Sequence, residues 1–316
     1  RQPLRRPVAQ VALGEVAAPA FAAAQKARME SGFSWTDLAP EFVEKAKALA
    51  KIGSEQGLAL FLGAGVSCSA GLPSWNGLLS KLAEKIGITG SELTEFGNLD
   101  VLDRGSVLER RYRARKQDVN DQIARIFSLA REYDLDIDFH LDFHLDPARM
   151  DLGEICRMTE AHGMGGRVAA GHVSALSALP PDEAAAWARR MADAGVALTV
   201  LPATDLFLMG REARHLTPRG VAPAHDFHRC GVTCSLATNN VLNPFTPFGD
   251  GSLLRMANLY ANAAQLGAAE DHALCFDMVS SAPARLMGLD YGVREGARAD
   301  LVALDARSEA EAVATL

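Results

Sequence analysis

The sequence has little of what marks membrane, nucleic-acid-binding or disulfide-rich proteins. No apolar run is long enough to span a bilayer. Acidic residues outnumber basic ones by 39 to 32, and the net charge of −7 argues against binding to nucleic acid or to an anionic membrane. The cysteines number only five, and they are scattered, which is typical of reduced thiols rather than of a disulfide framework. We therefore expect a cytoplasmic protein with no nucleic-acid or membrane partner.

The chain is long enough for one large or two ordinary domains, with 316 residues of which 48% are hydrophobic. Three zones differ in pattern. Residues 1–54 are rich in alanine and lysine and indicate a helical or flexible lead-in. Residues 55–118 contain a short apolar strand, a glycine turn and helices. Residues 119–316 alternate between amphipathic helices and short apolar strands.

The alternation from residue 119 onward predicts an α/β fold with a parallel sheet, because helices of this length between strands form βαβ units. The expected strands end in polar residues, namely His140, His172, Thr204 and Asn239. In α/β barrels and open α/β sheets alike, the carboxyl end of the strands carries the chemistry. Neighbouring strand ends lie about 4.8 Å apart, so we expect His140 and His172 to approach each other.

One segment, "DIDFHLDFHLD" at 136–146, alternates polar and apolar residues without exception. Alternation alone favours a half-exposed strand with its polar side in water. The polar side, however, consists only of Asp and His, which are ligands of Zn²⁺ and Fe²⁺. In a barrel strand the apolar side would pack under helices, and His140 would point at a ligand with Asp142 one step further out.

Residues 119–306 resemble the cytosine-deaminase-like branch of the amidohydrolase superfamily. The resemblance is carried by "DIDFHLDFHLDP", "AHGMGGRVAAGHVSAL", "LPATDLFLMGR", "GVTCSLATNNVLNPFTPFGDGSLLRMANL" and "SSAPARLMGLDYGVREGARADLVALDA". It implies the last units of a TIM-like (βα) barrel, with a terminal β-segment at 290–305 from a small β-sandwich. It also implies hydrolysis of a C–N bond in a cytosine-like or other cyclic amide or amidine by metal-activated water. His140 and His172 match the histidines of the fifth and sixth barrel strands.

Some positions depart from that family's pattern. No His-x-His pair precedes residue 119, the acid/base glutamate position holds Phe143, and Asn239 stands where the family has a metal-binding aspartate. The resemblance therefore implies a divalent metal, Zn or Fe, held weakly by His140, His172 and Asn239. Asp142 is the nearest residue able to act as a general base, and we predict that catalytic role for it.

A second stretch, "LALFLGAGVSCSAGLPSWNGLL" at 58–79, resembles the NAD-binding turn of sirtuin-type domains. Glycines let the backbone approach a pyrophosphate, and the following helix N-terminus favours its charge. The resemblance implies a Rossmann-like fragment at 55–118 that binds NAD through Gly63, Ala64, Gly65 and Ser67. We expect a strand at 58–62 and a helix at 75–86 around this turn.

Three functions stay open on sequence alone. The leading one is a metal-dependent amidohydrolase with a small-molecule substrate. The second is a sirtuin-type NAD-binding or NAD-consuming protein, and the third is a non-catalytic scaffold. A natural fusion, a chimera and an error in the gene model would each join two such segments. Association into a homo-oligomer is compatible with all three functions.

Overall fold

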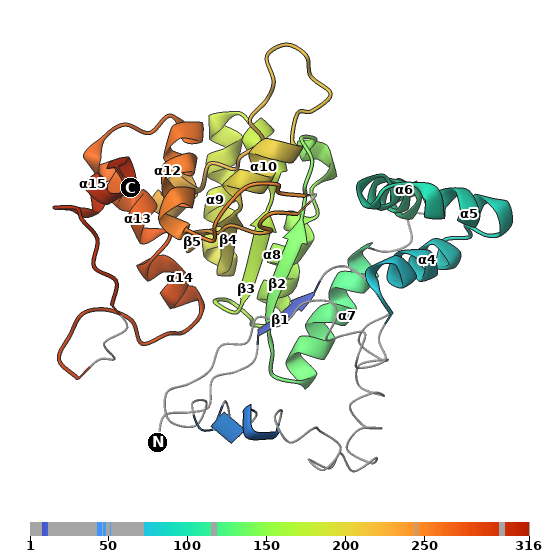
Figure 1. Ribbon diagram of the computed structural model, residues 1–316, viewed down its shortest axis with the longest axis horizontal. Helices are drawn as coiled ribbons and strands as arrows, with labels where there is room; N and C mark the ends of the chain where they lie inside the picture. The colour runs from blue at the N-terminus through green and yellow to red at the C-terminus, as the bar shows by residue number, and fades with distance from the viewer. Residues whose placement is uncertain are drawn as a thin grey trace. The chain divides into compact units, whose positions relative to one another are not determined.

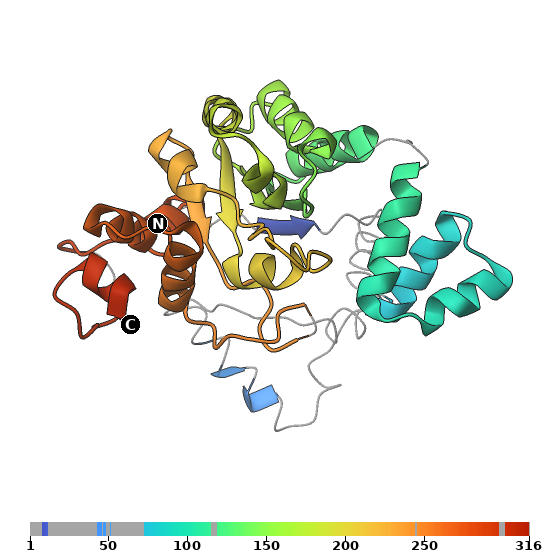
Figure 2. The same ribbon diagram turned by 90° about the horizontal axis from the view of Figure 1, so that it is seen from above.

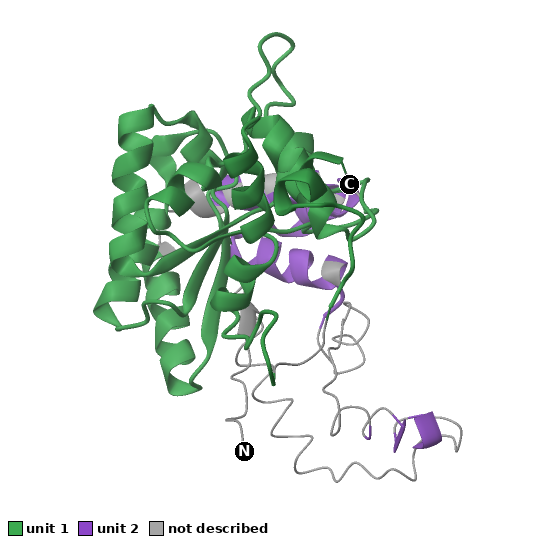
Figure 3. Ribbon diagram, turned by 90° about the vertical axis from the view of Figure 1, so that its left-hand side faces the viewer, with its two compact units in different colours: residues 1–13, 118–316 green, residues 14–117 purple. Residues whose placement is uncertain are grey.

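The computed structural model describes residues 8–11, 43–45, 47–48, 51, 73–114, 119–243, 245–296 and 301–315. The chain splits into two compact units, residues 1–13 with 118–316 (unit 1) and residues 14–117 (unit 2), coloured separately in Figure 3. Unit 1 contains the two histidines predicted as metal ligands. The three-part division of the chain at residues 54 and 118 stays a prediction.

Unit 1 is built on a parallel sheet of five strands (Figure 1). The strands are β1 (Val8–Val11), β2 (Asp136–Leu141), β3 (Val168–His172), β4 (Val196–Val200) and β5 (Cys234–Leu236), and they pair in that order. Every pairing is parallel, so successive strands need crossover connections. The predicted α/β fold with a parallel sheet is therefore confirmed, and it is consistent with part of a (βα) barrel. β1 lies in the predicted lead-in, where four residues give too short a pattern to indicate a strand.

Helices lead into strands β2 to β5, and the first three of these helices are predicted from the sequence. These helices are α7 (Val119–Glu132), α8 (Leu152–Ala161), α9 (Pro181–Ala194) and α11 (Ala224–Arg229). α9 shows why the ends of these helices can be predicted from the sequence. Proline occupies its first turn beside acidic residues, and Gly195 ends it in the left-handed conformation with φ 69°. Figure 2 shows α7, α8 and α9, drawn in green, together on one side of the sheet.

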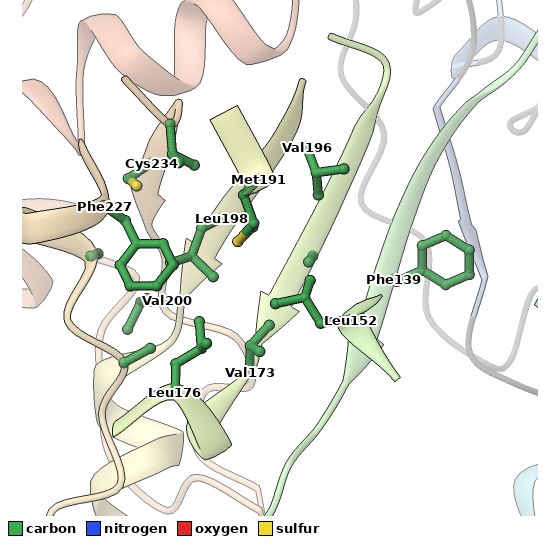
Figure 4. Packing of buried hydrophobic residues seen from close by; sticks show 14 of the residues in the cluster. Phe139, Leu152, Val173, Leu176, Met191, Val196, Leu198, Val200, Phe227 and Cys234 are labelled. Carbon is green, nitrogen blue, oxygen red and sulfur yellow. The ribbon is translucent and has the colours of Figure 1, made fainter. Parts of the chain in front are cut away.

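The core of unit 1 lies between the sheet and these helices. Phe139, on the apolar side of β2, packs against Phe127 of α7 with ring centroids 5.9 Å apart. Leu152 of α8 and Met191 of α9 belong to the same buried cluster (Figure 4). Because side chains alternate across a strand, the polar side of β2 faces away from these helices. The placement expected for a barrel strand is thus the one observed.

Two sequence expectations fail after β4. The strand predicted to reach Thr204 stops at Val200, and Thr204 lies on α10 (Pro202–Leu208). Pro202 explains the difference, because proline cannot donate to a strand ladder but suits the first turn of a helix. The β-segment at 290–305 is also not observed, since its described parts, 290–296 and 301–305, contain no strand. A strand needs a partner for its ladder, and no described residue pairs with this segment.

The remaining elements of unit 1 are short and mostly helical. They are the 3-10 turns η2 (Pro147–Arg149) and η3 (Ser174–Ala178), and the helices α12 (Leu253–Ala264), α13 (Ala269–Asp277), α14 (Ser281–Leu286) and α15 (Glu309–Thr315). None of the helices in the described ranges is long and apolar enough to cross a membrane. The cysteines in those ranges, Cys156, Cys230, Cys234 and Cys275, form no disulfide with one another.

Unit 2 is helical wherever the structure describes it at length. Between residues 73 and 114 it contains α4 (Trp75–Lys85), α5 (Gly90–Asn98) and α6 (Val101–Ala114), and no strand. The helix expected after the glycine turn is confirmed as α4, whose N-cap Ser74 accepts a hydrogen bond from the Gly77 amide. The expected strand at 58–62 and the turn at 63–67 lie outside the described residues. The Rossmann-like fragment is therefore not shown.

Candidate metal centre at the carboxyl end of the sheet

Two histidine rings meet where β2 and β3 end. Parallel pairing sets His140 beside Gly171 and Leu141 beside His172, so the histidines are offset by one residue on neighbouring strands. Their ring centroids lie 5.0 Å apart, with the ring planes at 76°. The prediction that these two side chains approach each other at one rim of the sheet is confirmed.

Gly171 provides the space that the His140 ring occupies. A methyl group at Gly171 would lie 3.3 Å from Cδ2 and 3.4 Å from Nε2 of His140, and 3.2 Å from the carbonyl oxygen of Phe139. Such distances are tighter than ordinary van der Waals contact. Glycine on β3 therefore lets the imidazole from β2 lie over the neighbouring strand.

The backbone is strained where these strands end. Asp142, His172 and Asn239 adopt left-handed conformations with φ of 51°, 66° and 56°, and Val173 follows with φ of 45°. For a residue with a side chain this conformation costs on the order of 1–2 kcal/mol. Strain of this kind concentrates at functional sites. Its occurrence after β2, β3 and β5 supports the rim as the candidate site.

Asp205 of α10 lies behind His172. Its Oδ1 is 2.6 Å from the His172 Nδ1, and its Oδ2 accepts a hydrogen bond of 3.3 Å from the Leu201 amide. Both side chains are almost completely buried, and burial raises the pKa of Asp205 while the hydrogen bond to His172 opposes the shift. Asp205 is not among the site residues predicted from the sequence. A usable signal was present, because a carboxylate within an apolar run must find a partner if it is buried.

Asn239, which follows β5, lies on the other side of the same ring. Its Nδ2 is 3.4 Å from the His172 Nε2. The His172 imidazole therefore lies between a carboxylate and an amide. Phe143 contacts the ring as well, with centroids 4.4 Å apart.

Asp138 and His140 share the polar side of β2, with Asp138 Oδ2 lying 3.8 Å from His140 Nε2. Burial, and next the nearby His172, lower the pKa of His140 to about 4. Burial raises the pKa of Asp138 to about 6, although His172 opposes the shift. His140 is therefore neutral at neutral pH and can offer a lone pair.

Asp142 is positioned as a cap on α8. Its Oδ1 accepts a 2.8 Å hydrogen bond from the Asp151 amide, and its Oδ2 accepts one of 3.0 Å from the Leu152 amide. The side chain is fully buried. A carboxylate at a helix N-terminus satisfies amides that have no partner within the helix. Catalysis by Asp142 stays a prediction, and its contacts favour a structural role.

The outer part of the alternating segment has local partners. His144 Nδ1 accepts a 3.3 Å hydrogen bond from the Asp146 amide, and Asp146 caps η2 through the Ala148 amide at 3.1 Å. At the other end of β2, Asp136 pairs with Arg167. His140, in the middle of the row, contacts the ring of the second histidine.

The described residues supply part of a site for Zn²⁺ or Fe²⁺. Imidazole is a good ligand for both ions, and His140 and His172 converge. Within the part of the chain that the structure describes, however, no group of three or more His, Cys, Asp and Glu is arranged to hold a metal ion. Catalytic zinc sites ordinarily use three protein ligands. The donor set thus fits two imidazole positions, with Asn239 as a weaker third.

Residues 20–315 match the family model described as the amidohydrolase family. Among curated proteins, a pterin deaminase of Rhizobium rhizogenes is 31% identical over 200 residues, which cover 61% of this chain and 45% of that protein. An N-isopropylammelide isopropyl amidohydrolase of a Pseudomonas species is 25% identical over 196 residues, with the same coverage. The chain spans about half the length of the curated relatives that it matches.

Solved structures of similar proteins also match this chain. A 5-methylcytosine deaminase of Klebsiella pneumoniae bound to 5-fluorocytosine matches with a TM-score of 0.58 and 26% identity, covering 62% of this chain and 49% of that one. An N-isopropylammelide isopropylaminohydrolase of Burkholderia multivorans matches with a TM-score of 0.53 and 28% identity, covering 61% and 46%.

These similarities give no support to a sirtuin fragment. The amidohydrolase family model runs across the segment with Gly63, Ala64, Gly65 and Ser67, and the NAD prediction is left without support.

Proposed function

This chain belongs to the amidohydrolase family, and from that premise we propose that it takes part in the hydrolysis of a C–N bond in a nitrogen heterocycle. The observation that carries the proposal is the convergence of His140 and His172 at the carboxyl end of the parallel sheet. Active sites of α/β barrels lie at this end of the strands.

The substrate class follows from the relatives that the chain resembles. They are named for pterin, 5-methylcytosine and N-isopropylammelide, and all three are nitrogen heterocycles. Their names describe deaminases or amidohydrolases. We propose a small heterocycle with an amino or alkylamino substituent as the substrate of this chain.

His140, His172 and Asn239 are the residues that would hold a divalent metal. Such an ion supplies an activated water in hydrolases of this chemical class. The partial donor set supports weak binding, and hydrolysis by the chain alone should be slow or absent unless another segment supplies ligands. Asp142, proposed as the general base, already accepts hydrogen bonds from the amides of Asp151 and Leu152, so it would take a proton on a remaining lone pair.

The test begins with the purified chain. It is dialysed against a mild chelator, analysed for metal, reloaded with Zn²⁺ or Fe²⁺, and offered pterin, 5-methylcytosine and N-isopropylammelide. Release of ammonia or isopropylamine that is lost in the His140→Gln/His172→Gln double variant supports the proposal. Failure of a metal-loaded, folded chain to bind any of the three heterocycles would overturn it in favour of a scaffold. A stoichiometric ion that survives the chelator would contradict weak binding.

A further inference from the structure

The surroundings of His172 define which of its nitrogens carries the proton. An ionised carboxylate only accepts hydrogen bonds, so the 2.6 Å contact with Asp205 requires a proton on Nδ1. On the far side of the ring, the Asn239 amide nitrogen is a donor 3.4 Å from Nε2. Two donors facing each other would repel, so Nε2 accepts. Both neighbours therefore favour the same tautomer.

Asp205 is itself held in place. It has no exposed surface, and its second oxygen accepts the hydrogen bond of the Leu201 amide at the start of α10. A backbone amide can only donate, so it keeps an acceptor oxygen on that side. The Asp205 carboxylate is thereby held between an amide that can only donate a hydrogen bond and an imidazole whose proton can move from one nitrogen to the other.

We propose that Asp205 is a positioning residue that keeps His172 protonated at Nδ1 and presents an unprotonated Nε2 to the rim of the sheet. An unprotonated Nε2 can bind a metal ion or take a proton, whereas an N–H can do neither. A carboxylate behind a histidine ligand acts in this way at many metal sites. Only the catalytic meaning of this role rests on the proposed function, because the tautomer itself is a property of the folded chain.

Asp205→Asn is the variant that separates positioning from packing. Asparagine has nearly the same shape but only one acceptor oxygen. If that oxygen stays on the Leu201 amide, the side-chain NH₂ faces His172 and requires Nδ1 to accept. The imidazole can satisfy it by moving its proton to Nε2. We therefore expect the tautomer to invert while the fold is kept.

The first readout is ¹⁵N NMR of the histidine side chains, recorded on the metal-free full chain at one alkaline pH. The signals of His172 are assigned as those that disappear in the His172→Gln variant. The parent should show a protonated Nδ1, and Asp205→Asn a protonated Nε2. The matched control is Asp277→Asn, because Asp277 also lies beside a histidine, 3.2 Å from His228 Nε2, on helices outside the rim. It should leave the His172 signals unchanged.

The second readout is Zn²⁺ affinity by calorimetry. Asp205→Asn should weaken binding about 10- to 100-fold, as losses of such partners commonly do, and the Asp277→Asn control should bind like the parent. A parent whose His172 is protonated at Nε2 overturns the proposal, and that measurement needs no variant to fold. An Asp205→Asn chain with parental tautomer and parental affinity also overturns it.

The outcomes distinguish this role from the proposed function. Inversion of the tautomer in a chain that neither binds nor hydrolyses any of the heterocycles would keep Asp205 as the positioning residue and contradict the proposed hydrolase function. Hydrolysis that is unaffected by Asp205→Asn, with no change of tautomer, would keep the hydrolase and remove the positioning role.

Discussion

The two halves of the segment 136–146 contain the same residue types and do different things. In the first half, residues 136–140, the backbone is a β-strand, and its polar side ends at His140 beside His172. In the second half, residues 142–146, the backbone has left the strand at Asp142, and the same Asp and His residues hold a helix end and a 3-10 turn. The comparison shows that the conformation of the backbone, and not composition, decides which histidine is placed for chemistry.

The sharpest contrast is between the histidines of the two halves. Replacing His140 or His172 by alanine should lower the affinity for Zn²⁺ about 10-fold or more, because each change removes a proposed metal ligand. Losing a ligand should weaken binding at least as much as losing a residue that only supports a ligand, which typically costs about 10- to 100-fold. His144→Ala is the control from the second half and should stay within about twofold. Equilibrium dialysis measures all three. An equal loss of Zn²⁺ affinity in His144→Ala would show that the two halves do not differ in metal binding.

The next effect concerns the stability of the fold. Asp142→Ala leaves the amides of Asp151 and Leu152 without their acceptor, and should lower the free energy of unfolding by about 1–3 kcal/mol. Asp146→Ala removes an exposed cap and should cost less. Urea unfolding provides the measurement. If Asp142→Ala kept its stability and lost hydrolysis alone, the carboxylate would belong to the chemistry after all.

The smallest effect is a pH dependence within the first half. The folded pKa of His140, about 4, lies below its ordinary 6.5, so the unfolded chain binds that proton first and stability is lost as the pH falls from 6.5 to 4. The folded pKa of Asp138, about 6, lies above its ordinary 3.8, so stability is gained as the pH falls from 6 towards 4. The two contributions oppose each other.

Asp138→Asn removes one of these contributions. Between pH 6 and 4 its stability should fall more steeply than that of the parent, and His140→Gln should fall less steeply. Both side chains are about one third exposed, so solvent screening keeps the differences small. Denaturant unfolding at several pH values measures the stability of the parent and of both variants. If all three lost stability equally as the pH falls, the opposing contributions of Asp138 and His140 would be excluded.

The fold of residues 119–240 was readable from the sequence because its helices and strands have strong local signals. α9 has proline and acids at its start and glycine at its end. β3 is a fully buried apolar run. The sequence could not place the end of β4, since "VALTVLPAT" continues the apolar pattern into a helix. It also could not indicate β1, whose pairing with β2 joins residues far apart in the chain.

The site was readable in part for the same reason. His140 and His172 were predictable because they end two recognisable strands, and the geometry of a parallel sheet then brings them together. The contact between Asp205 and His172 joins α10 to β3 across 33 positions of sequence, and no local pattern encodes it. The contacts of Asp142 depend on where β2 bends, which alternating residues do not reveal.

The left-handed residues at the strand ends have a consequence for directed evolution. Val173 is branched at Cβ, adopts φ 45°, and is completely buried directly after His172. Glycine accepts such a conformation without strain, so the ends of these strands are places where glycine would relieve backbone strain. Glycine at Val173 would leave a cavity in the core, however, and glycine at His172 would leave the buried Asp205 carboxylate without its partner. Both losses cost more than the strain that glycine relieves, so a library selected only for heat resistance should keep His172 and Val173. Selection for stability alone would thus retain both the strained turn and the imidazole at the rim of the sheet.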